Sequence, residues 1–258
     1  LRPARPQWGI TSPDIICEGE VEGGISRMLW LYADTKDVPE KVGPLRSARP
    51  SYVKFSKFFD AIFIHWGGSH STKKYTGGYE TIKKEKVNNI GVLNGKKIKK
   101  AIEKKGYRTE LKDSSFSPLH FNSTVAPAGA DGATSVGVKF SDRTDTRKFT
   151  YNAEDGKYST NDWEKKVKFQ NLIILKAEST YITVPYKGST TTYLNYKWNS
   201  GSGKYISNGT ATDITWEIAD GKLVLKDAVG NTLSVNKGKS YIGFVSSNHN
   251  GKITCSAE

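Results

Sequence analysis

Two arginines and a histidine occupy a short stretch of this chain at a spacing that could bind an anion. Arg46 and Arg49 are three residues apart between Pro44 and Pro50, and His65 follows sixteen residues after Arg49. Guanidinium groups can grip a carboxylate or a phosphate from two directions, and an imidazole titrates near neutral pH. The stretch therefore indicates an anion-binding site with His65 as a candidate acid or base.

Main-chain donors could serve the same anion. Gly67, Gly68 and Ser69 follow an apolar strand predicted at 60–65, and successive N–H groups in such a turn form an anion-binding nest. Residues 50–59 predict a helix with a proline in its first turn, and its unpaired N–H groups form the positive end of a dipole. The predicted ligand-binding residues are therefore Arg27, Arg46, Ser47, Arg49, Gly67, Gly68 and Ser69.

Carboxylates near the N-terminus allow two interpretations of these cations. Glu18 and Glu22 are four residues apart, and either could assist His65 in catalysis. In the alternative interpretation, the arginines form buried ion pairs with the same carboxylates and His65 is a core residue with its hydrogen bonds made. Carboxylates at positions 18, 20 and 22 would repel one another on one strand face, so some of them must be paired.

Composition limits the class of protein. The chain has 258 residues and a net charge of +13, and positions 80–112 carry eleven Lys or Arg against four acids. Within them, residues 95–106 predict a basic helix, which either attracts polyanions or is a solvated face. No Cys or His pair has zinc-ligand spacing, so we expect no metal site. Cys17 and Cys255 could form a disulfide, or Cys17 could be a buried apolar residue.

Hydrophobic patterning predicts an α+β fold in two parts. Residues 1–126 combine buried strands with short helices, which indicates a mixed α/β-sheet domain. Residues 127–133 are small and turn-rich, so we place the domain boundary there. Residues 134–258 alternate short strands with Asp-Gly and Asn-Gly turns, which predicts a mostly antiparallel β domain.

Several blocks of sequence along the chain point to a known family: residues 4–10, 14–18, 21–27, 43–50, 60–69, 201–203, 216 and 236–242. In this order they resemble the YerB-like bacterial lipoprotein family, a domain of unknown function. The resemblance covers most of the chain, including its N-terminal and C-terminal family domains. The chain departs from the family at Cys17, where a Tyr is usual, and near His120, where the Pro-His-Asn pattern has an extra residue.

The resemblance implies an extracytoplasmic protein anchored to the cell membrane as a lipoprotein, with a signal and a lipid-bearing Cys removed upstream. We favour a non-enzymatic ligand-binding or interaction module with an anion-friendly cleft and no cofactor. Its expected partner is an anionic envelope polymer or a small anionic ligand, and a protein partner stays open. Nucleic acid is disfavoured because no nucleic-acid motif is present. The rival hypothesis is a cell-wall hydrolase or transferase that uses His65 with Glu18 or Glu22.

Overall fold

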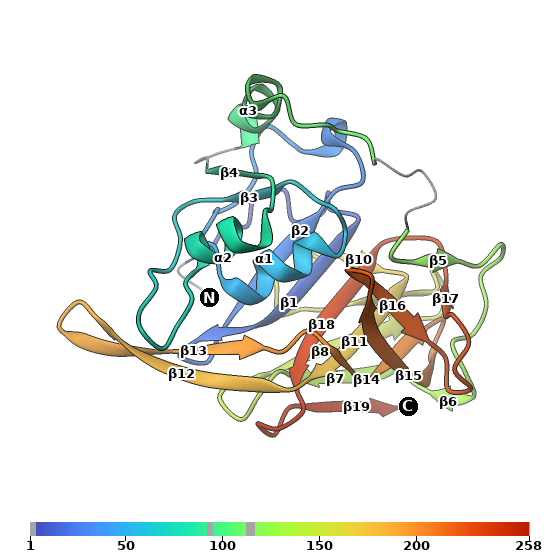
Figure 1. Ribbon diagram of the computed structural model, residues 1–258. Coiled ribbons are helices and arrows are strands. Elements are labelled where there is room, and N and C mark those ends of the chain that lie inside the picture. The colour runs from blue at the N-terminus through green and yellow to red at the C-terminus, as the bar shows by residue number, and fades with distance from the viewer. Residues whose placement is uncertain (1–3, 92–94, 112–116, 258) are drawn as a thin grey trace.

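The computed structural model describes residues 4–91, 95–111 and 117–257, which form two large β-sheets and a helical layer (Figure 1). In the larger sheet, β2 (Ile25–Leu31) pairs with β1, and β6 (Asp131–Gly132) pairs with β15. The main path of this sheet is β12 (Ser179–Tyr186), β13 (Ser189–Tyr196), β1 (Ile15–Glu22), β18 (Ser240–Ser246), β11 (Asn171–Ala177), β14 (Ser200–Ser207), β15 (Thr210–Ala219) and β16 (Lys222–Lys226). The smaller sheet is β10 (Lys168–Phe169), β9 (Lys157–Ser159), β8 (Thr146–Asn152), β7 (Ser135–Lys139) and β19 (Lys252–Ser256).

The larger sheet is buried on both faces because a different layer packs against each. On β11, Leu172 belongs to a core cluster that includes Phe149 of the smaller sheet. The next residue, Ile173, belongs to a second cluster that includes Phe55 of α1 (Pro50–Lys57). Side chains alternate between the faces of a strand, so a strand covered on both sides reads as one apolar run. The sequence Leu172–Leu175 is such a run, and all four residues are fully buried.

The helical layer contains a small parallel unit beside α1. β3 (Phe63–His65) and β4 (Asn89–Gly91) pair in parallel, with α2 (Gly78–Glu85) as the crossover between them. α3 (Ile98–Lys105) packs against this unit through Ile98 and Ile102, which share a cluster with Ile90 of β4. The remaining elements are η2 (Thr35–Asp37), η3 (Gly95–Lys97) and the parallel pair β5 (His120–Phe121) and β17 (Ser234–Val235).

Local sequence signals placed several elements correctly. α1 begins at Pro50, after Arg49 in an extended conformation, and α3 ends at Gly106, whose φ is +61°. A glycine tolerates this left-handed conformation without a steric cost, so it is a common helix terminator. Asn208-Gly209 and Asp220-Gly221 form the β14–β15 and β15–β16 hairpin turns, with positive φ at all four residues. These predictions of helices and hairpins are confirmed.

The α+β content is confirmed, but the two predicted parts do not form separate sheets. β1, from the first part, lies between β13 and β18, which both come from the second. Five residues of β1, Ile15 to Gly19, pair in parallel with Ser240 to Phe244 of β18. A buried apolar strand must satisfy its main-chain groups on both edges, and β18 provides one of those edges. The domain boundary at 127–133 itself stays a prediction.

Both cysteines are free, and they belong to different layers. Cys17 is fully buried in the cluster with α1, while Cys255 packs against the cluster beneath the smaller sheet. Burial raises the pKa of the Cys17 thiol well above its usual value. Of the two alternatives for Cys17, the structure shows the buried apolar residue. None of the described helices has the length and apolar character that a bilayer crossing requires.

A glycine substitution tests how closely the strands of the larger sheet are packed. A Cβ at Gly201 of β14 would overlap the Lys176 carbonyl oxygen and lie 2.8 Å from Nε1 of Trp216. We expect Gly201→Ala to cost about 1–3 kcal/mol and lower the Tm by several degrees. Gly91→Ala is the matched control, because the nearest atom to its Cβ would be 3.9 Å away. Equal melting temperatures for the two variants, measured by circular dichroism, would contradict this packing.

Candidate functional site

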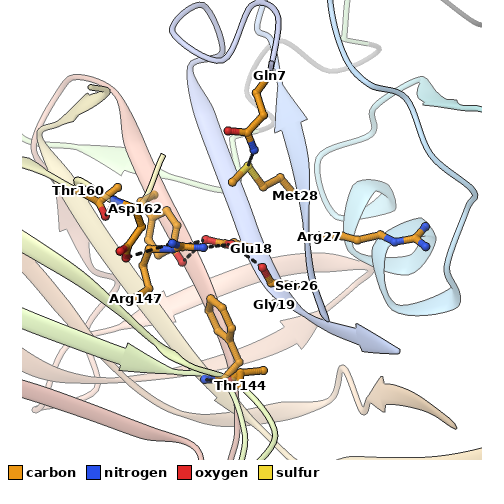
Figure 2. A network of polar contacts seen from close by, with 12 residues as sticks. Gln7, Glu18, Gly19, Ser26, Arg27, Met28, Thr144, Arg147, Thr160 and Asp162 are labelled. Carbon is orange, nitrogen blue, oxygen red and sulfur yellow. Dashed lines mark hydrogen bonds and ion pairs between the residues drawn. The ribbon is translucent and has the colours of Figure 1, made fainter. Parts of the chain in front are cut away.

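The three carboxylates of β1 are directed to two different layers. Glu18 and Glu20 are fully buried and face the smaller sheet, where their partners lie. The register between β1 and β2 shifts between Glu20 and Glu22, and such an irregularity re-aims the side chains beyond it. Glu22 binds arginines on the α1 side. Figure 2 shows Glu18 and Arg27 pointing to opposite sides of the β1–β2 pair.

Glu18 is at the centre of the polar network that joins the two sheets. One of its oxygens accepts from Nη2 of Arg147 at 2.6 Å and from Ser26 at 2.7 Å, and the other accepts from Nε of Arg147 and the Tyr241 hydroxyl, both at 3.1 Å. Arg147 also pairs with Asp162 at 3.0 Å (Figure 2). Burial acts to lower the pKa of Arg147, but attraction to Glu18 outweighs it and the pKa is raised.

Glu20 makes a second set of contacts on the same side. It accepts hydrogen bonds from Ser141, from the Gly24 main-chain N–H at 3.2 Å and from the Tyr181 hydroxyl at 3.2 Å. Tyr181 also binds Asp142 at 3.1 Å. A buried carboxylate needs such donors to offset the loss of hydration. Sequence reasoning missed the contacts of Glu20 with Ser141 and Tyr181 and that of Glu18 with Arg147, because each joins residues more than a hundred positions apart and has no local signal.

Glu22 fastens the candidate arginines to each other. Arg49 donates two hydrogen bonds to its two oxygens, at 2.9 and 2.7 Å, and Arg27 forms an ion pair with it. Arg27 also donates to the Ser47 carbonyl at 2.8 Å. Burial and then repulsion by Arg49 lower the pKa of Arg27. The structure therefore brings together Arg27, Ser47 and Arg49, in the ion-paired arrangement that the sequence analysis left as an alternative.

His65 and the glycine turn are engaged elsewhere. His65 is 4% exposed, with Nδ1 2.7 Å from the Gly67 carbonyl oxygen and Nε2 3.4 Å from Oδ1 of Asn89. Oγ of Ser69 accepts from the Gly78 N–H at 2.8 Å, which anchors the start of α2. No carboxylate contacts His65 among the described residues, and its partners are neutral oxygens. A catalytic role for His65 with Glu18 or Glu22 therefore has no supporting contact, and the role of the glycine turn stays a prediction.

The arginine segment and the glycine turn lie side by side and are joined through their main chains. Ala48 pairs with Gly68 as a short parallel bridge, with hydrogen bonds from the Ala48 N–H to the Gly67 carbonyl and from the Ser69 N–H to the Ala48 carbonyl. The segments are therefore neighbours. Their pairing occupies the N–H and carbonyl of Ala48, the Gly67 carbonyl and the Ser69 N–H. We predicted that the arginines and the His65 imidazole face one pocket. The contacts do not show this arrangement.

An open cleft lies along the outer edge of β2. Its volume is about 1620 Å³, and every residue of β2, from Ile25 to Leu31, lines it. Among the described strands β2 pairs with β1 alone, so its other edge is left to the cleft. The candidates that line the cleft are Glu18, Glu22, Arg27, Arg46, Ser47 and Arg49, whereas His65, Gly67, Gly68 and Ser69 are not among its lining residues.

Arg46 differs from the other arginines of the cleft. Its residue is exposed, and its side chain has no hydrogen bond or ion pair with any residue that the structure describes. By contrast, Arg108 pairs with Asp60, and Arg147 pairs with Glu18. The Arg46 carbonyl accepts from the Trp66 N–H at 3.0 Å, so the main chain at this residue is held in place. The cleft thus contains an exposed guanidinium group with unused donors on an anchored segment of main chain.

Two other features of the described chain bear on chemistry. Across residues 4–91, 95–111 and 117–257, no group of three or more His, Cys, Asp and Glu side chains could hold a metal ion. His120 lies in β5, where it pairs with Ser234, and it is exposed. The arrangement therefore provides a cleft lined by ion pairs, with the unpaired guanidinium group of Arg46 available for binding.

This protein has a β-rich fold, a layer of short helices and an ion-paired first strand. Comparison with known proteins identifies the family to which it belongs. Residues 1–108 match the family described as "Protein of unknown function (DUF3048) N-terminal domain", and residues 136–242 match its C-terminal domain. The "Putative lipoprotein YerB" of Bacillus subtilis (strain 168) is 30% identical over 269 residues, covering 94% of this chain and 77% of that protein. The chain belongs to this YerB-like DUF3048 family, as the sequence analysis predicted.

A solved structure shares the fold. The crystal structure of YerB from Bacillus subtilis superposes with a TM-score of 0.75 and 24% sequence identity. The match covers 98% of this chain and 90% of that chain. The shared fold therefore extends over nearly the whole chain. At 24% sequence identity the similarity shows the fold alone.

Removing the charge of Glu18 tests the importance of the inter-sheet network. Glu18→Gln would leave Arg147 half-buried beside Asp162 only, and breaking a buried ion pair costs about 3–5 kcal/mol. We expect a lower urea midpoint with an unchanged slope. Glu178→Gln removes an exposed pair with Lys197 and serves as the control, which should unfold as the wild type does. A wild-type midpoint for Glu18→Gln would show that the network does not hold the sheets together.

Buried tyrosines predict a loss of stability at high pH. Burial raises the pKa of Tyr75 to about 12, and it raises those of Tyr52, Tyr196 and Tyr241 well above the usual value. Above about pH 10 the unfolded state releases these protons first, so the tyrosines' contribution to the free energy of unfolding is constant below that pH and falls above it. Urea unfolding across this range, with tyrosinate absorbance at each pH, measures the effect. Tyr75→Phe should reduce the pH slope, and an unchanged slope would contradict the assignment.

Proposed function

We propose that this chain is an extracytoplasmic, lipid-anchored protein of the bacterial envelope whose cleft along β2 binds an anionic ligand. The relative described as a "Putative lipoprotein" supports the location, and the cleft geometry supports binding. Clefts with a few directed polar groups on half-buried apolar walls are the usual form of a binding site. The proposed role is recognition, because no carboxylate contacts His65 among the described residues.

The unpaired guanidinium of Arg46 is the observation that carries the proposal. A guanidinium group in a cleft loses part of its hydration, and a charge-assisted hydrogen bond to a carboxylate or phosphate would replace it. Four of the other cleft arginines have anions of their own: Glu22 for Arg27 and Arg49, Asp60 for Arg108, and Glu18 for Arg147. The fifth, Arg5, donates to the Asp162 main-chain carbonyl. Arg46 is therefore the cleft guanidinium without any side-chain partner among the described residues, and all of its donors are available to an external ligand.

The charges next to Arg46 favour the same kind of ligand. Arg27 and Arg49 share a single carboxylate, Glu22, so that cluster carries one positive charge, and Arg46 adds a second. Repulsion between the two paired arginines already contributes to the lowered pKa of Arg27. An anion bound beside them would relieve this repulsion, since an opposite charge within a few ångströms stabilises a charged group. The ligand classes that fit are an anionic envelope polymer and a small anion such as phosphate.

Arginine substitution tests the proposal with two defined probes. We expect Arg46→Ala to weaken binding of a glycerol-phosphate oligomer by about tenfold or more, because a hydrogen bond to a charged group is worth about 1.5–3 kcal/mol. Isothermal titration calorimetry measures the affinity, and inorganic phosphate separates a single anionic group from a polymer. The Tm of the variant should stay at the wild-type value, because the side chain is exposed and unpaired.

Arg143→Ala is the matched control. Arg143 is exposed, stacks over the Tyr181 ring at 4.0 Å and does not line the cleft, so its loss changes the net charge equally without touching the site. Equal weakening by both variants would reduce the binding to a diffuse attraction by a basic protein. Failure of the wild-type chain to bind either probe would overturn the proposed anion site.

A further inference from the structure

A second concentration of positive charge consists of lysines and lies on η3 and α3, the helix whose Ile98 and Ile102 also line the cleft. Residues 96–105 contain six lysines and one glutamate, and they form η3 and α3. In Figure 1, α3 forms one end of the molecule, beyond β3 and β4 and away from the two large sheets. All six of these lysines are exposed: Lys96, Lys97, Lys99, Lys100, Lys104 and Lys105.

The apolar side of α3 is already used by the fold. Ile98 and Ile102 are each 5% exposed and pack with Ile90, which fixes the helix on the β3–β4 unit. The lysines therefore project outward from a helix that has no spare apolar stripe. A surface of this kind binds by charge and cannot insert into a bilayer core.

The lysines have few internal partners. Nζ of Lys99 contacts the Lys36 carbonyl at 3.4 Å and Nζ of Lys105 donates to the Asn89 carbonyl at 3.0 Å, and both acceptors are neutral. No ion pair between these six lysines and an acid occurs among the described residues. Glu103 lies on α3 itself, and Asp34, the N-cap of η2, is near enough to Lys99 to interact with it electrostatically but is paired with Lys36. The surface keeps a net positive charge.

The chemistry of the residues selects among anionic partners. Lysine ammonium groups are compact, mobile point charges, which suit an array of laterally mobile phosphates, whereas bidentate recognition favours arginine. Single-stranded nucleic acid would need exposed aromatic platforms, and the aromatic residue next to α3, Tyr107, is half-buried under Lys105. A flat, charged lipid surface fits a short helix whose exposed side carries lysines and a single acid, Glu103.

We infer that η3 and α3 form a docking surface for the anionic phospholipid headgroups of the membrane. The inference rests on the proposed function for its location, because a lipid anchor would keep α3 within reach of the bilayer. Each lysine near an anionic surface contributes about 1 kcal/mol, which is about fivefold in affinity. Docking would hold the chain in a defined orientation on the membrane, with α3 facing the lipid.

Vesicle binding tests this surface. Wild-type chain should co-sediment with vesicles of equimolar phosphatidylglycerol and phosphatidylcholine, and not with phosphatidylcholine alone. Binding should fall steeply between about 0.1 M and about 1 M salt, since the Debye length shortens from about 10 Å to about 3 Å. The variant with Lys99→Glu, Lys100→Glu and Lys104→Glu should lose at least tenfold in affinity. A second variant with Gln at these positions should lose less, in the same direction.

Matched controls keep the test specific. The triple variant Lys148→Glu, Lys166→Glu and Lys237→Glu changes the net charge equally at exposed positions outside α3 and should bind vesicles as the wild type does. Equal loss in this control would overturn a localised surface. A wild-type chain that binds glycerol-phosphate polymer or duplex DNA through α3 but ignores the vesicles would overturn the lipid assignment. Arg46→Ala should bind vesicles normally, which separates this surface from the cleft.

Discussion

The pairing of β1 with β18 is the constraint on which the rest of this molecule depends. It joins a strand from the first twenty-two residues to a strand near the C-terminus, and it places β1 in the interior of a ten-stranded sheet. Glu18 and Glu20 are thereby fully buried. A carboxylate taken out of water is tolerated only with donors around it, so the smaller sheet must present Arg147 and Ser141 at these positions.

The shift in register near the end of β1 lets one strand hold two layers. Before it, Glu18 binds Arg147 on the smaller sheet, and beyond it, Glu22 binds Arg49 at the start of α1. The same irregularity directs Glu22 away from Glu18 and Glu20, so repulsion between Glu22 and these two carboxylates is avoided. Because Arg27 and Arg49 are committed to Glu22, the cleft keeps its free cation at Arg46, one residue away from the carbonyl that Arg27 binds.

The sequence contains enough local information to predict the helices at 50 and 98 and the two hairpin turns, because proline, glycine and apolar spacing act within a few residues. It also identifies the family. It does not determine the ion pairs, since Glu18 and Arg147 are 129 positions apart and only the strand order brings them together. Nor does it show that Ala48 and Gly68 pair through the main chain, which engages the glycine turn and leaves His65 with neutral partners.

The paired arginines and the lysines of α3 have different roles. Arginines make the ion pairs that join layers, with Glu18, Glu22 and Asp60, because a guanidinium fork matches a carboxylate and is weakly hydrated. The lysines of α3 stay in water, where an ammonium group keeps its hydration and remains available to other surfaces. The net charge of +13 arises from cations in excess of the acids, and Arg46 and the six lysines of η3 and α3 are among the cations without a paired acid. Charge that contributes nothing to stability is retained only at the cost of self-repulsion, which is the physical reason to look for its partners outside the chain.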